Sequence, residues 1–410
     1  RPAADAELAG AAAAWWTEYD ATCAEPGPCA CGRTPVPAAW GCSLPNPADV
    51  PEENDHADVD CLVGNAPAQS VIYMPAGIWN DDAFGAPGAA ITLNRSDVVL
   101  RCESNTTSTF VAVDDLTGNN CQGEGGAPNA NMCGATILSI GAVNMYGTEV
   151  AWTSGFTYGT TVIGVSDSSP WSVGDWVMLR MDDGRIANCS LIDDTATGAN
   201  QDSLQWKNLF NHYARVVAKG QTSLTLDRGL PFDYQPPAPS CGSRVAMKVT
   251  PIERVGVESC GFKYRYTLQP RTDYGKDCQM VMGGVADSWA RGNRFEGGDE
   301  CVVRRRMAWR NWFEGNDFID TQGTTFNTEN LHESSGTGQN VDENNAFDQA
   351  TVSSKREAGG HLSVFAYNYT AGRNATPIQD SFFMHGRYHG PELAEGNDAD
   401  VRLLGVDHWW

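Results

Sequence analysis

Short apolar runs separated by turn residues dominate the chain after residue 61. The clearest runs are 71–74, 90–93, 98–100, 161–165, 175–180, 214–217, 223–226 and 245–249. Runs of this length, bounded by Gly, Pro, Asn and Asp, are typical of β-strands. No long, strongly periodic helix follows residue 19, so the pattern predicts an all-β chain.

The first 61 residues have a different texture. Residues 3–19 are rich in Ala, and Leu8, Ala12 and Trp15 recur at helical spacing, which predicts one helix. Residues 20–61 are rich in Cys, Pro and Gly and are expected to form loops held by disulfides. The chain therefore divides into residues 1–61, a cap helix with a disulfide-rich leader, and residues 62–410, a single β domain.

A repeat in the C-terminal third decides the type of β fold. The tripeptide Asn-x-Phe occurs at 293–295, 316–318 and 345–347, and weaker copies begin at Asn368 and Asn397. The successive spacings are 23, 29, 23 and 29 residues, and one coil of a parallel β-helix takes roughly 20–30 residues. Stacked coils bring equivalent residues about 4.8 Å apart. The repeat therefore predicts an Asn ladder and a stack of Phe rings along a parallel β-helix.

The same alignment places Cys278 over Cys301 and Trp289 over Trp312. Both pairs are 23 residues apart, like the first two Asn residues of the repeat. Cysteines and tryptophans that recur at the ladder spacing support the same stacking of coils.

Several segments resemble a known superfamily. Residues 71–79 (VIYMPAGIW), 90–104 (AITLNRSDVVLRCES) and 109–111 (TFV) resemble the opening turns of pectate-lyase-like right-handed parallel β-helices, and the early helix resembles their N-terminal cap. The resemblance implies a right-handed parallel β-helix. The calcium-binding Asp set and catalytic Arg of true pectate lyases are not matched position by position, so their activity is not carried over.

A second resemblance lies near the C-terminus. Residues 363–374 and 380–397 are similar to a motif of secreted bacterial β-helix proteins, which carry His-Gly-x-His followed by Glu-Gly-Asn. Here the motif reads His385-Gly-Arg-Tyr-His389, then Glu395-Gly-Asn397.

Charge and length narrow the possible partners. Lys and Arg number 28 against 51 Asp and Glu, so the net charge is −23. Such a surface repels nucleic acid, whose phosphates need a basic face. It also repels a polyanionic glycan unless cations or a local Arg-rich groove intervene. No apolar run approaches the roughly 18–20 residues of a membrane span, so none is expected.

The 13 cysteines show no paired zinc spacing. They favour a disulfide-bearing exported protein, and the odd count leaves one thiol free or bonded to another chain. The start Arg1-Pro2-Ala3 looks like a mature end left after cleavage, so a secreted, extracellular or cell-surface location is expected.

Asp55, Asp58 and Asp60 alternate with other residues and form a candidate Ca²⁺ site, although the EF-hand spacing and glycine are missing.

The candidate catalytic residues lie in two segments of the chain. Three consecutive arginines occupy 304–306, where strand alternation sends Arg304 and Arg306 to one face and Arg305 to the other. Arg304 and Arg306 could neutralise a uronate carboxylate or act as the base of a lyase. The alternative is ion pairing on stacked coils, with Asp287, Glu300 or Glu314 as partner.

The second place is the late histidine pair, His385 and His389, with Arg387 between them. β-Elimination from a uronide needs a group that neutralises the carboxylate and a base that removes a proton, and Arg and His can fill these roles. The residues expected to bind the substrate are Trp309, Trp312, Tyr388 and Glu333.

Hydrolysis would instead need two carboxylates about 5–9.5 Å apart. The candidates are Asp299, Glu300, Asp320, Glu333, Asp342 and Glu343, and the sequence cannot select a pair.

The leading prediction is a secreted enzyme that acts on an extracellular polysaccharide, and a lyase is favoured over a hydrolase. The alternative is a non-catalytic surface, adhesive or fibre-forming scaffold. The strand-like texture at 407–410 predicts an open sheet edge and self-association there.

Overall fold

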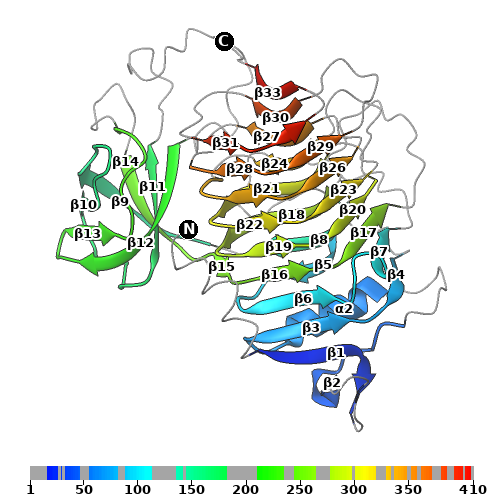
Figure 1. The fold of residues 1–410 in the computed structure, drawn as a ribbon. Coiled ribbons are helices and arrows are strands. Elements are labelled where there is room, and N and C mark those ends of the chain that lie inside the picture. Colours follow the sequence, from blue (N-terminus) through cyan, green and yellow to red (C-terminus); the bar gives the residue numbers. More distant parts are fainter. Residues whose placement is uncertain are drawn as a thin grey trace.

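The computed structural model describes most of the chain. The described residues are 16–25, 29, 33–46, 55–81, 88–112, 135–141, 145–181, 210–234, 244–264, 278–297, 301–319, 329–333, 337–348, 352–357, 362–371, 380–385, 392–399 and 402–407. Within them the protein is a three-sheet parallel β-helix with one antiparallel barrel inserted, so the predicted all-β, parallel β-helix fold is confirmed (Figure 1).

Three parallel sheets run the length of the solenoid. Sheet A consists of β2 (Thr34–Val36), β1 (Thr17–Ala24), β3 (Ser70–Met74), β6 (Val98–Cys102), β16 (Gly256–Glu258), β19 (Trp289–Arg291), β22 (Trp312–Glu314), β25 (Val341–Glu343), β28 (Val364–Ala366) and β31 (Leu393–Glu395). Sheet B consists of β4 (Gly77–Asp81), β7 (Ser108–Ala112), β17 (Gly261–Tyr264), β20 (Arg294–Glu296), β23 (Asp317–Ile319), β26 (Ala346–Asp348), β29 (Tyr369–Ala371) and β32 (Asp398–Ala399).

Sheet C consists of β5 (Gly88–Leu93), β8 (Ala135–Gly141), β18 (Cys278–Ala286), β21 (Cys301–Trp309), β24 (Glu329–Glu333), β27 (Val352–Glu357), β30 (Asp380–His385) and β33 (Arg402–Asp407), and β15 (Ile252–Glu253) pairs with β18. One strand from each sheet, in the order A, B, C, makes one coil. The coils are numbered 1 (β3, β4, β5) to 8 (β31, β32, β33), and coil 2 (β6, β7, β8) precedes the inserted barrel.

The corner between sheets A and B is built by the predicted Asn ladder. From coil 4 onward each ladder Asn donates from Nδ2 to Oδ1 of the next, over 2.9–3.1 Å. Each Oδ1 also accepts the backbone N–H of the previous ladder Asn. Because backbone groups at a buried corner have no water, these side chains satisfy groups that would otherwise be orphaned.

A second ladder, which the sequence analysis did not identify, builds the corner between sheets C and A. Ser288 accepts the N–H of Val255 through Oγ, and Asn311, Asn340 and Ser363 repeat this contact coil by coil. The residue before each ladder position has positive φ in both series, as at Arg310 (60°) and Gly315 (61°). One left-handed residue followed by a ladder Asn or Ser thus turns the chain at both corners.

The predicted Phe stack fills the interior behind sheet B. Phe110, Phe262, Phe295, Phe318 and Phe347 are fully buried and stack in sequence, with centroids 4.7–5.7 Å apart. Parallel in-register strands bring like residues together, and offset stacking of the rings is favourable. The predicted pairs Cys278 beside Cys301 and Trp289 beside Trp312 are also in register.

Residues 146–249 depart from the expected single β-helix. They form a closed antiparallel barrel of β9 (Tyr146–Ser154), β10 (Val162–Val165), β11 (Trp176–Met181), β12 (Phe210–Lys219), β13 (Ser223–Leu226) and β14 (Arg244–Val249). Figure 1 shows it beside the solenoid in green. Short alternating strands serve a barrel as well as a coil, so the pattern predicted the strands but not their partners.

The barrel packs against the corner between sheets C and A. Tyr213 stacks on Trp309 with centroids 3.8 Å apart, and Trp176 meets Trp309 edge-on at 5.4 Å. Asp287 pairs with Arg310 (2.7 Å) and with Arg215 of the barrel (3.1 Å). The barrel is therefore fixed to coils 3 and 4 by aromatic contacts and ion pairs.

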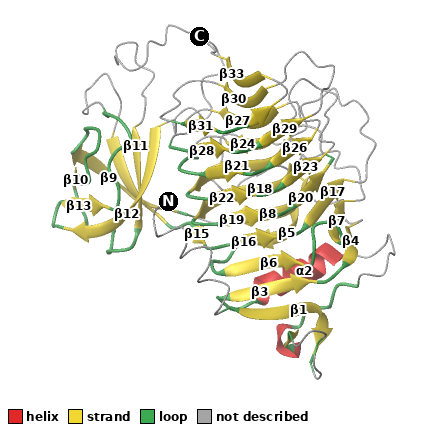
Figure 2. Cartoon of the chain, viewed as in Figure 1, coloured by secondary structure: helices red, strands yellow, loops and turns green. Residues whose placement is uncertain are grey.

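The N-terminal end corrects the helix prediction. Thr17, Glu18 and Tyr19 lie in β1, which pairs in parallel with β3, and residues 3–15 lie outside the described residues. Sheet pairing has overridden the helical spacing here. The one described α-helix is α2 (Asp55–Asn65), which packs on β4 and β5 at this end of the solenoid (Figure 2).

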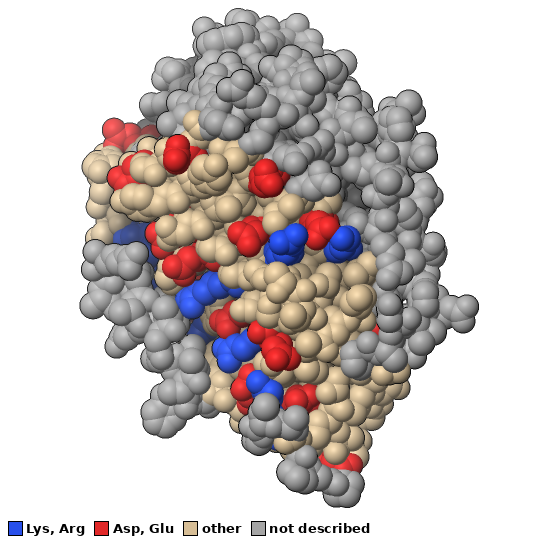
Figure 3. Space-filling model, turned by 45° about the vertical axis from the view of Figure 1, so that its right-hand side comes forward, with Lys and Arg blue, Asp and Glu red and all other residues tan. Residues whose placement is uncertain are grey.

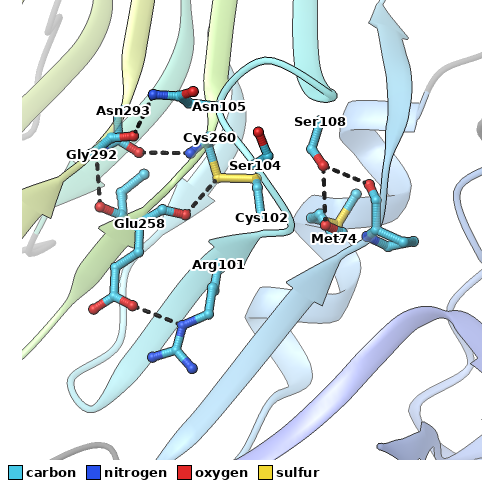
Figure 4. The surroundings of a disulfide bond; sticks show 12 residues. Met74, Arg101, Cys102, Ser104, Asn105, Ser108, Glu258, Cys260, Gly292 and Asn293 are labelled. Atoms are coloured by element: carbon cyan, nitrogen blue, oxygen red, sulfur yellow. Dashed lines mark hydrogen bonds and ion pairs between the residues drawn. A yellow bond between two sulfur atoms is a disulfide. The ribbon is translucent and has the colours of Figure 1, made fainter. Parts of the chain in front are cut away.

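Three disulfides have both partners described. Cys23–Cys29 and Cys42–Cys61 staple the predicted disulfide-rich leader. Cys102–Cys260 joins coil 2 to coil 3 across 158 residues of sequence, and therefore across the whole inserted barrel (Figure 4). Cys260 also donates its N–H to Asn293 of the ladder (3.0 Å), so the staple and the corner are continuous.

Candidate functional site

The outer face of sheet A carries an apolar column. Along the sheet, Trp289, Trp312, Val341, Val364 and Leu393 occupy one register position. The residues that follow the first four of them are buried in the interior: Ala290, Phe313, Asp342 and Phe365. Alternation within each strand therefore directs this column outward.

Two residues farther along each strand lies a charged column on the same face. Its members in order are Arg101, Glu258, Arg291, Glu314 and Glu343, and Glu395 follows after Ala366. Arg101 pairs with Glu258 (2.8 Å), and Arg291 lies 3.8 Å from Glu314. The charges alternate in the early coils, and only carboxylates continue the column after Arg291.

Indole and guanidinium groups connect the two columns. Trp289 Nε1 donates to Glu258 (2.6 Å), and Trp312 Nε1 donates to Glu343 (3.1 Å). The Arg291 guanidinium lies 4.6 Å from the Trp312 ring centroid and 5.8 Å from that of Trp289. Trp289 is nearly buried, whereas Trp312 is half-buried and keeps part of its ring at the surface.

Glu314 and Glu343 are direct neighbours on β22 and β25. Parallel strands lie about 4.8 Å apart, so the two glutamates start from neighbouring backbone positions and project from the same face. Retaining glycosidases use two carboxylates about 5–5.5 Å apart, a separation that neighbouring glutamates can reach. Arg291 stands beside one carboxylate and the Trp312 N–H holds the other. The face thus combines an aromatic surface, a cation and a carboxylate pair.

Figure 3 shows the surface turned toward sheets A and B. Basic and acidic side chains lie side by side over its lower and middle part, whereas toward the later coils the described surface shows acidic side chains without basic ones. The sequence agrees, because residues 341–348, 362–371 and 392–399 contain no Lys or Arg.

Of the residues predicted to bind substrate, Trp312 lies on this face and Trp309 does not. Trp309 is fully buried between the solenoid and the barrel ring of Tyr213. Its role in the structure is packing, and a polymer cannot reach it.

Glu333 is also buried, inside the coils. It lies 3.1 Å from Arg305 and 2.6 Å from Arg356, and all three side chains are 0 % exposed. Asp342 completes the group with two 2.7 Å bonds from Arg305 and one of 2.8 Å from Arg356. Strand alternation does send Arg305 to the opposite face from its neighbours, where it pairs with Glu333 and Asp342. Glu300, one of the predicted ion-pair partners, lies outside the described residues.

This buried cluster shifts the pKa values of its members. Burial by itself would raise the pKa of Asp342, but Arg305 and Arg356 outweigh it and hold that pKa below its usual value. Burial lowers the pKa of Arg356, and the carboxylates around it more than compensate and raise it. Glu392, whose carboxylate lies 4.0 Å from Arg356 Nε, has its pKa raised to about 8 by burial.

Of the residues predicted for a lyase, Arg304, Arg306 and the strand position of His385 lie within the described residues. Arg304 is 7 % exposed and Arg306 is half-buried, both on β21. His385 ends β30, which is separated from β21 by β24 and β27, or roughly 14 Å at the usual strand spacing. Arg387, Tyr388 and His389 lie outside the described residues.

The three aspartates of the predicted Ca²⁺ site lie on α2 rather than in a loop. Asp55 is buried and accepts the N–H of Asn46 (3.0 Å), and Asp60 accepts the N–H of Thr92 (2.5 Å). Among the described residues, no group of three or more His, Cys, Asp or Glu side chains is placed to hold a metal ion. Calcium binding stays a prediction.

Arg291 and Glu314 were not predicted as site residues, although a signal was present. Four of the five ladder Asn residues follow the same pattern: WARG before Asn293, WFEG before Asn316, VDEN before Asn345, and LAEG before Asn397, whereas VFAY before Asn368 has Ala366 at the charged position. An apolar residue four places and a charged residue two places before the Asn predict both columns once the ladder is known.

Comparisons with known proteins add to the fold. No family model and no curated protein matches the chain. Among solved structures it is similar to the tailspike gp61 of Pseudomonas phage phi297, at 8 % identity and TM-score 0.41, over 86 % of this chain and 60 % of that one. The tailspike gp49 of Pseudomonas phage LKA1 matches at 10 % and 0.38, over 90 % and 63 %.

The gp54 tailspike of Acinetobacter baumannii bacteriophage AP22, solved with a capsular saccharide of that bacterium, matches at 8 % identity and TM-score 0.33. This match covers 88 % of this chain and 70 % of that one. The chain thus spans less than two thirds of the phi297 and LKA1 tailspikes. At such low identity the likeness concerns the β-helix and carries no information on activity. In the described part of the chain, no helix combines the length and apolarity that crossing a membrane requires.

Proposed function

We propose that the protein binds an extracellular polysaccharide along the outer face of sheet A and hydrolyses it with Glu314 and Glu343. The observation that carries the proposal is the register of these two carboxylates beside Trp312 on one surface. A sugar ring offers C–H groups to an aromatic face and hydroxyls to charged side chains, and this surface supplies both partners.

Hydrolysis fits the surface better than β-elimination. The face offers two adjacent carboxylates, which can divide the roles of acid and nucleophile or base. Arg304 and Arg306, two of the arginines predicted for a lyase, lie on sheet C, and Arg304 is almost fully buried. Arg291, held between Trp312 and Glu314, is free of the sheet interior and can donate hydrogen bonds to hydroxyl oxygens of the same polymer.

An extracellular location is part of the proposal. Disulfides form and persist in oxidising compartments, and three are described here.

The test is a panel of soluble polysaccharides, neutral (galactomannan, β-glucan, dextran), acidic (polygalacturonate, alginate) and bacterial capsular. Binding is measured by affinity electrophoresis, new reducing ends by a colorimetric assay, and unsaturated products by ultraviolet absorbance. We expect retardation by at least one polymer, and reducing ends without unsaturated product.

The variants Glu314→Gln and Glu343→Gln should keep retardation and lose reducing ends by about 10³-fold or more, as expected when a carboxylate acts directly in the reaction. Absorbance from an unsaturated product would replace hydrolysis by elimination. Retardation without any cleavage would leave a binding protein, and no retardation by any polymer would overturn the proposal.

A further inference from the structure

We infer that Tyr367 and Tyr369 form a sugar-stacking platform that takes neutral pyranose rings at the A–B corner of coil 7. The inference rests on the proposed function and extends it to the substrate class and to a second contact. Both rings lie at the surface, since Tyr367 is 56 % and Tyr369 is 52 % exposed.

The backbone of Tyr367 breaks the rule of its own ladder. The residue before each ladder position has positive φ, and in the other coils it is small: Ser259, Gly292, Gly315, Asn344 and Gly396. Tyr367 has φ 56°. A bulky side chain is strained in the left-handed region, where Gly and Asn are tolerated. The C–A corner places bulky Arg310 and Leu362 in the same region, so the backbone of Tyr367 supports a role outside the fold only together with the exposure of its ring.

The neighbouring coil leaves room for the ring. A Cβ at Gly396 would lie 2.5 Å from both Cδ1 and Cε1 of Tyr367, so the ring rests directly over this glycine. Tyr369 faces outward from β29 between Ala346 and Asp398. The small neighbours Gly396 and Ala346 leave the two rings uncovered, and within the described residues neither phenol hydroxyl makes a hydrogen bond.

The platform continues the outer face of sheet A. Tyr367 directly follows Ala366, which lies in the charged column between Glu343 and Glu395. Ala366 is two strands from Glu314, or roughly 10 Å at the usual spacing. A polymer laid along the carboxylate pair therefore reaches the two tyrosines with sugars farther along its chain.

Charge selects the class of sugar. Among the described residues, the exposed charged groups around the platform are Asp348, Glu395 and Asp398, and the described segments of coils 6 to 8 on sheets A and B hold no Lys or Arg. Within this part of the surface a uronate would meet like charge and no counterion, which disfavours it. Neutral rings lose nothing in this field, while their C–H faces still pack on the tyrosines.

The experiment uses affinity electrophoresis of the full chain in gels that contain neutral galactomannan, β-glucan or dextran, or acidic polygalacturonate. Tyr367→Gly removes the ring and also the strain, and Tyr367→Asn copies the residue that coil 6 has at this position. Tyr369→Ala removes the second ring. Tyr158→Ala is the matched control, because Tyr158 is 72 % exposed on the barrel.

We expect the neutral polymer that retards the wild type to bind each platform variant about tenfold more weakly, a change of about 1.4 kcal/mol. The thermal midpoints of Tyr367→Gly and Tyr367→Asn should equal or exceed that of the wild type, and Tyr158→Ala should bind normally. A lowered midpoint in both Tyr367 variants would instead make the ring a packing element and overturn the inference.

Unchanged retardation of the platform variants, or retardation of the wild type by polygalacturonate alone, would also overturn it, while the proposed function would stand. If no polymer retards the wild type, both fail together. Where a polymer does retard the wild type, the variant Trp312→Ala tests the proposed function separately from the tyrosines. It should lose binding even if the tyrosines prove irrelevant.

Discussion

The interior of the early coils, 2 and 3, is filled differently from that of the later coils, 4 to 6. At one position of sheet C the residues are Ile140 and Met282 in coils 2 and 3, and then Arg305, Glu333 and Arg356 in coils 4 to 6. Facing them, sheet A supplies Val257, Ala290 and Phe313 in coils 3 to 5, and then Asp342 in coil 6. At this position apolar residues are replaced by paired charges in coils 4 to 6, while Phe318, Phe347 and Phe365 keep the rest of the interior apolar.

The corners do not change between the two regions. The ladder that begins at Asn293 continues to Asn397 with the same contacts on both sides of the charged cluster. Stability of a solenoid is close to a sum of contacts between neighbouring coils. Corner hydrogen bonds and sheet pairing therefore define a coil, while its interior can hold either apolar side chains or ion-paired ones.

The early and later coils also differ in their disulfide bonds. The Cys102–Cys260 disulfide ties coil 2 to coil 3, and no cysteine follows position 301 in the sequence. The later coils can have no intrachain disulfide of their own. The early region thus depends on covalent closure around the barrel, and the later region depends on the ion cluster.

The largest expected effect comes from the staple. Replacing Cys102 and Cys260 by Ala opens a closure of 158 residues, and the chain-entropy model gives a loss of up to about 5 kcal/mol in the free energy of unfolding. The measurement is the denaturant midpoint and slope of the double variant against the wild type under oxidising conditions.

The matched control is the pair Cys23→Ala and Cys29→Ala. It opens a closure of only 6 residues, for which the same model gives about 2 kcal/mol. Equal losses for the two double variants would contradict the view that the long closure is what stabilises the early coils.

The second prediction tests the later region. Asp342→Ala removes the carboxylate that binds Arg305 and Arg356 at once, and leaves buried positive charge without a full partner. Breaking a buried pair on one side costs about 3–5 kcal/mol. We expect a loss of this size in the free energy of unfolding, measured by denaturation.

Its control replaces the whole group by apolar residues: Arg305→Met, Glu333→Leu, Asp342→Leu and Arg356→Met. Removal of all partners together is often neutral or stabilising. If this fourfold variant is as unstable as Asp342→Ala, the cluster contributes more than pairing, and the proposed equivalence of the two interiors is wrong.

The sequence predicted the parts of the fold that repeat. Asn and Phe recur at coil spacing because parallel stacking places each over its equivalent, so the ladder, the ring stack and the Trp289–Trp312 pair were all predictable. The barrel was not, because its strands carry the same alternation as coils and only their partners differ. The helix expected at 3–19 was contradicted at Thr17–Tyr19 by pairing with β3.

The candidate site shows the same limit. Alternation correctly separated Arg305 from its neighbours, but which face of the strand is the interior depends on the fold of the entire coil. For this reason Glu333 and Trp309, expected to contact substrate, proved to be buried. Glu314 could be selected only after the register placed it beside Glu343.

The third prediction concerns the corner that both regions share. Asn316→Ala removes an acceptor of the Asn293 N–H and a donor to Asn345, both buried. Leaving buried groups unsatisfied costs about 1–3 kcal/mol, and we expect about 2 kcal/mol in the free energy of unfolding. Asn397→Ala should cost less, since Asn397 is only half-buried and water can replace it. Equal costs would mean that burial of the ladder is unimportant.

The smallest effect, counted per pH unit, is the pH dependence of the cluster. Burial raises the pKa of Glu392 from 4.5 to about 8, so the folded chain holds a proton there that the unfolded chain releases between these values. Stability that depends on this proton is full below about pH 4.5 and is lost as the pH rises toward 8. The slope is about 1.4 kcal/mol per pH unit for one proton. Glu392→Gln, which cannot ionise, should flatten this decline, and denaturant midpoints of both proteins at pH 5, 6, 7 and 8 measure it.

Asp342 acts in the opposite direction, because its lowered pKa confines its effect on stability to pH values below about 4. Parallel curves for the wild type and Glu392→Gln over this range would show that Glu392 is ionised in the folded protein, and that the later interior holds three carboxylates against two arginines.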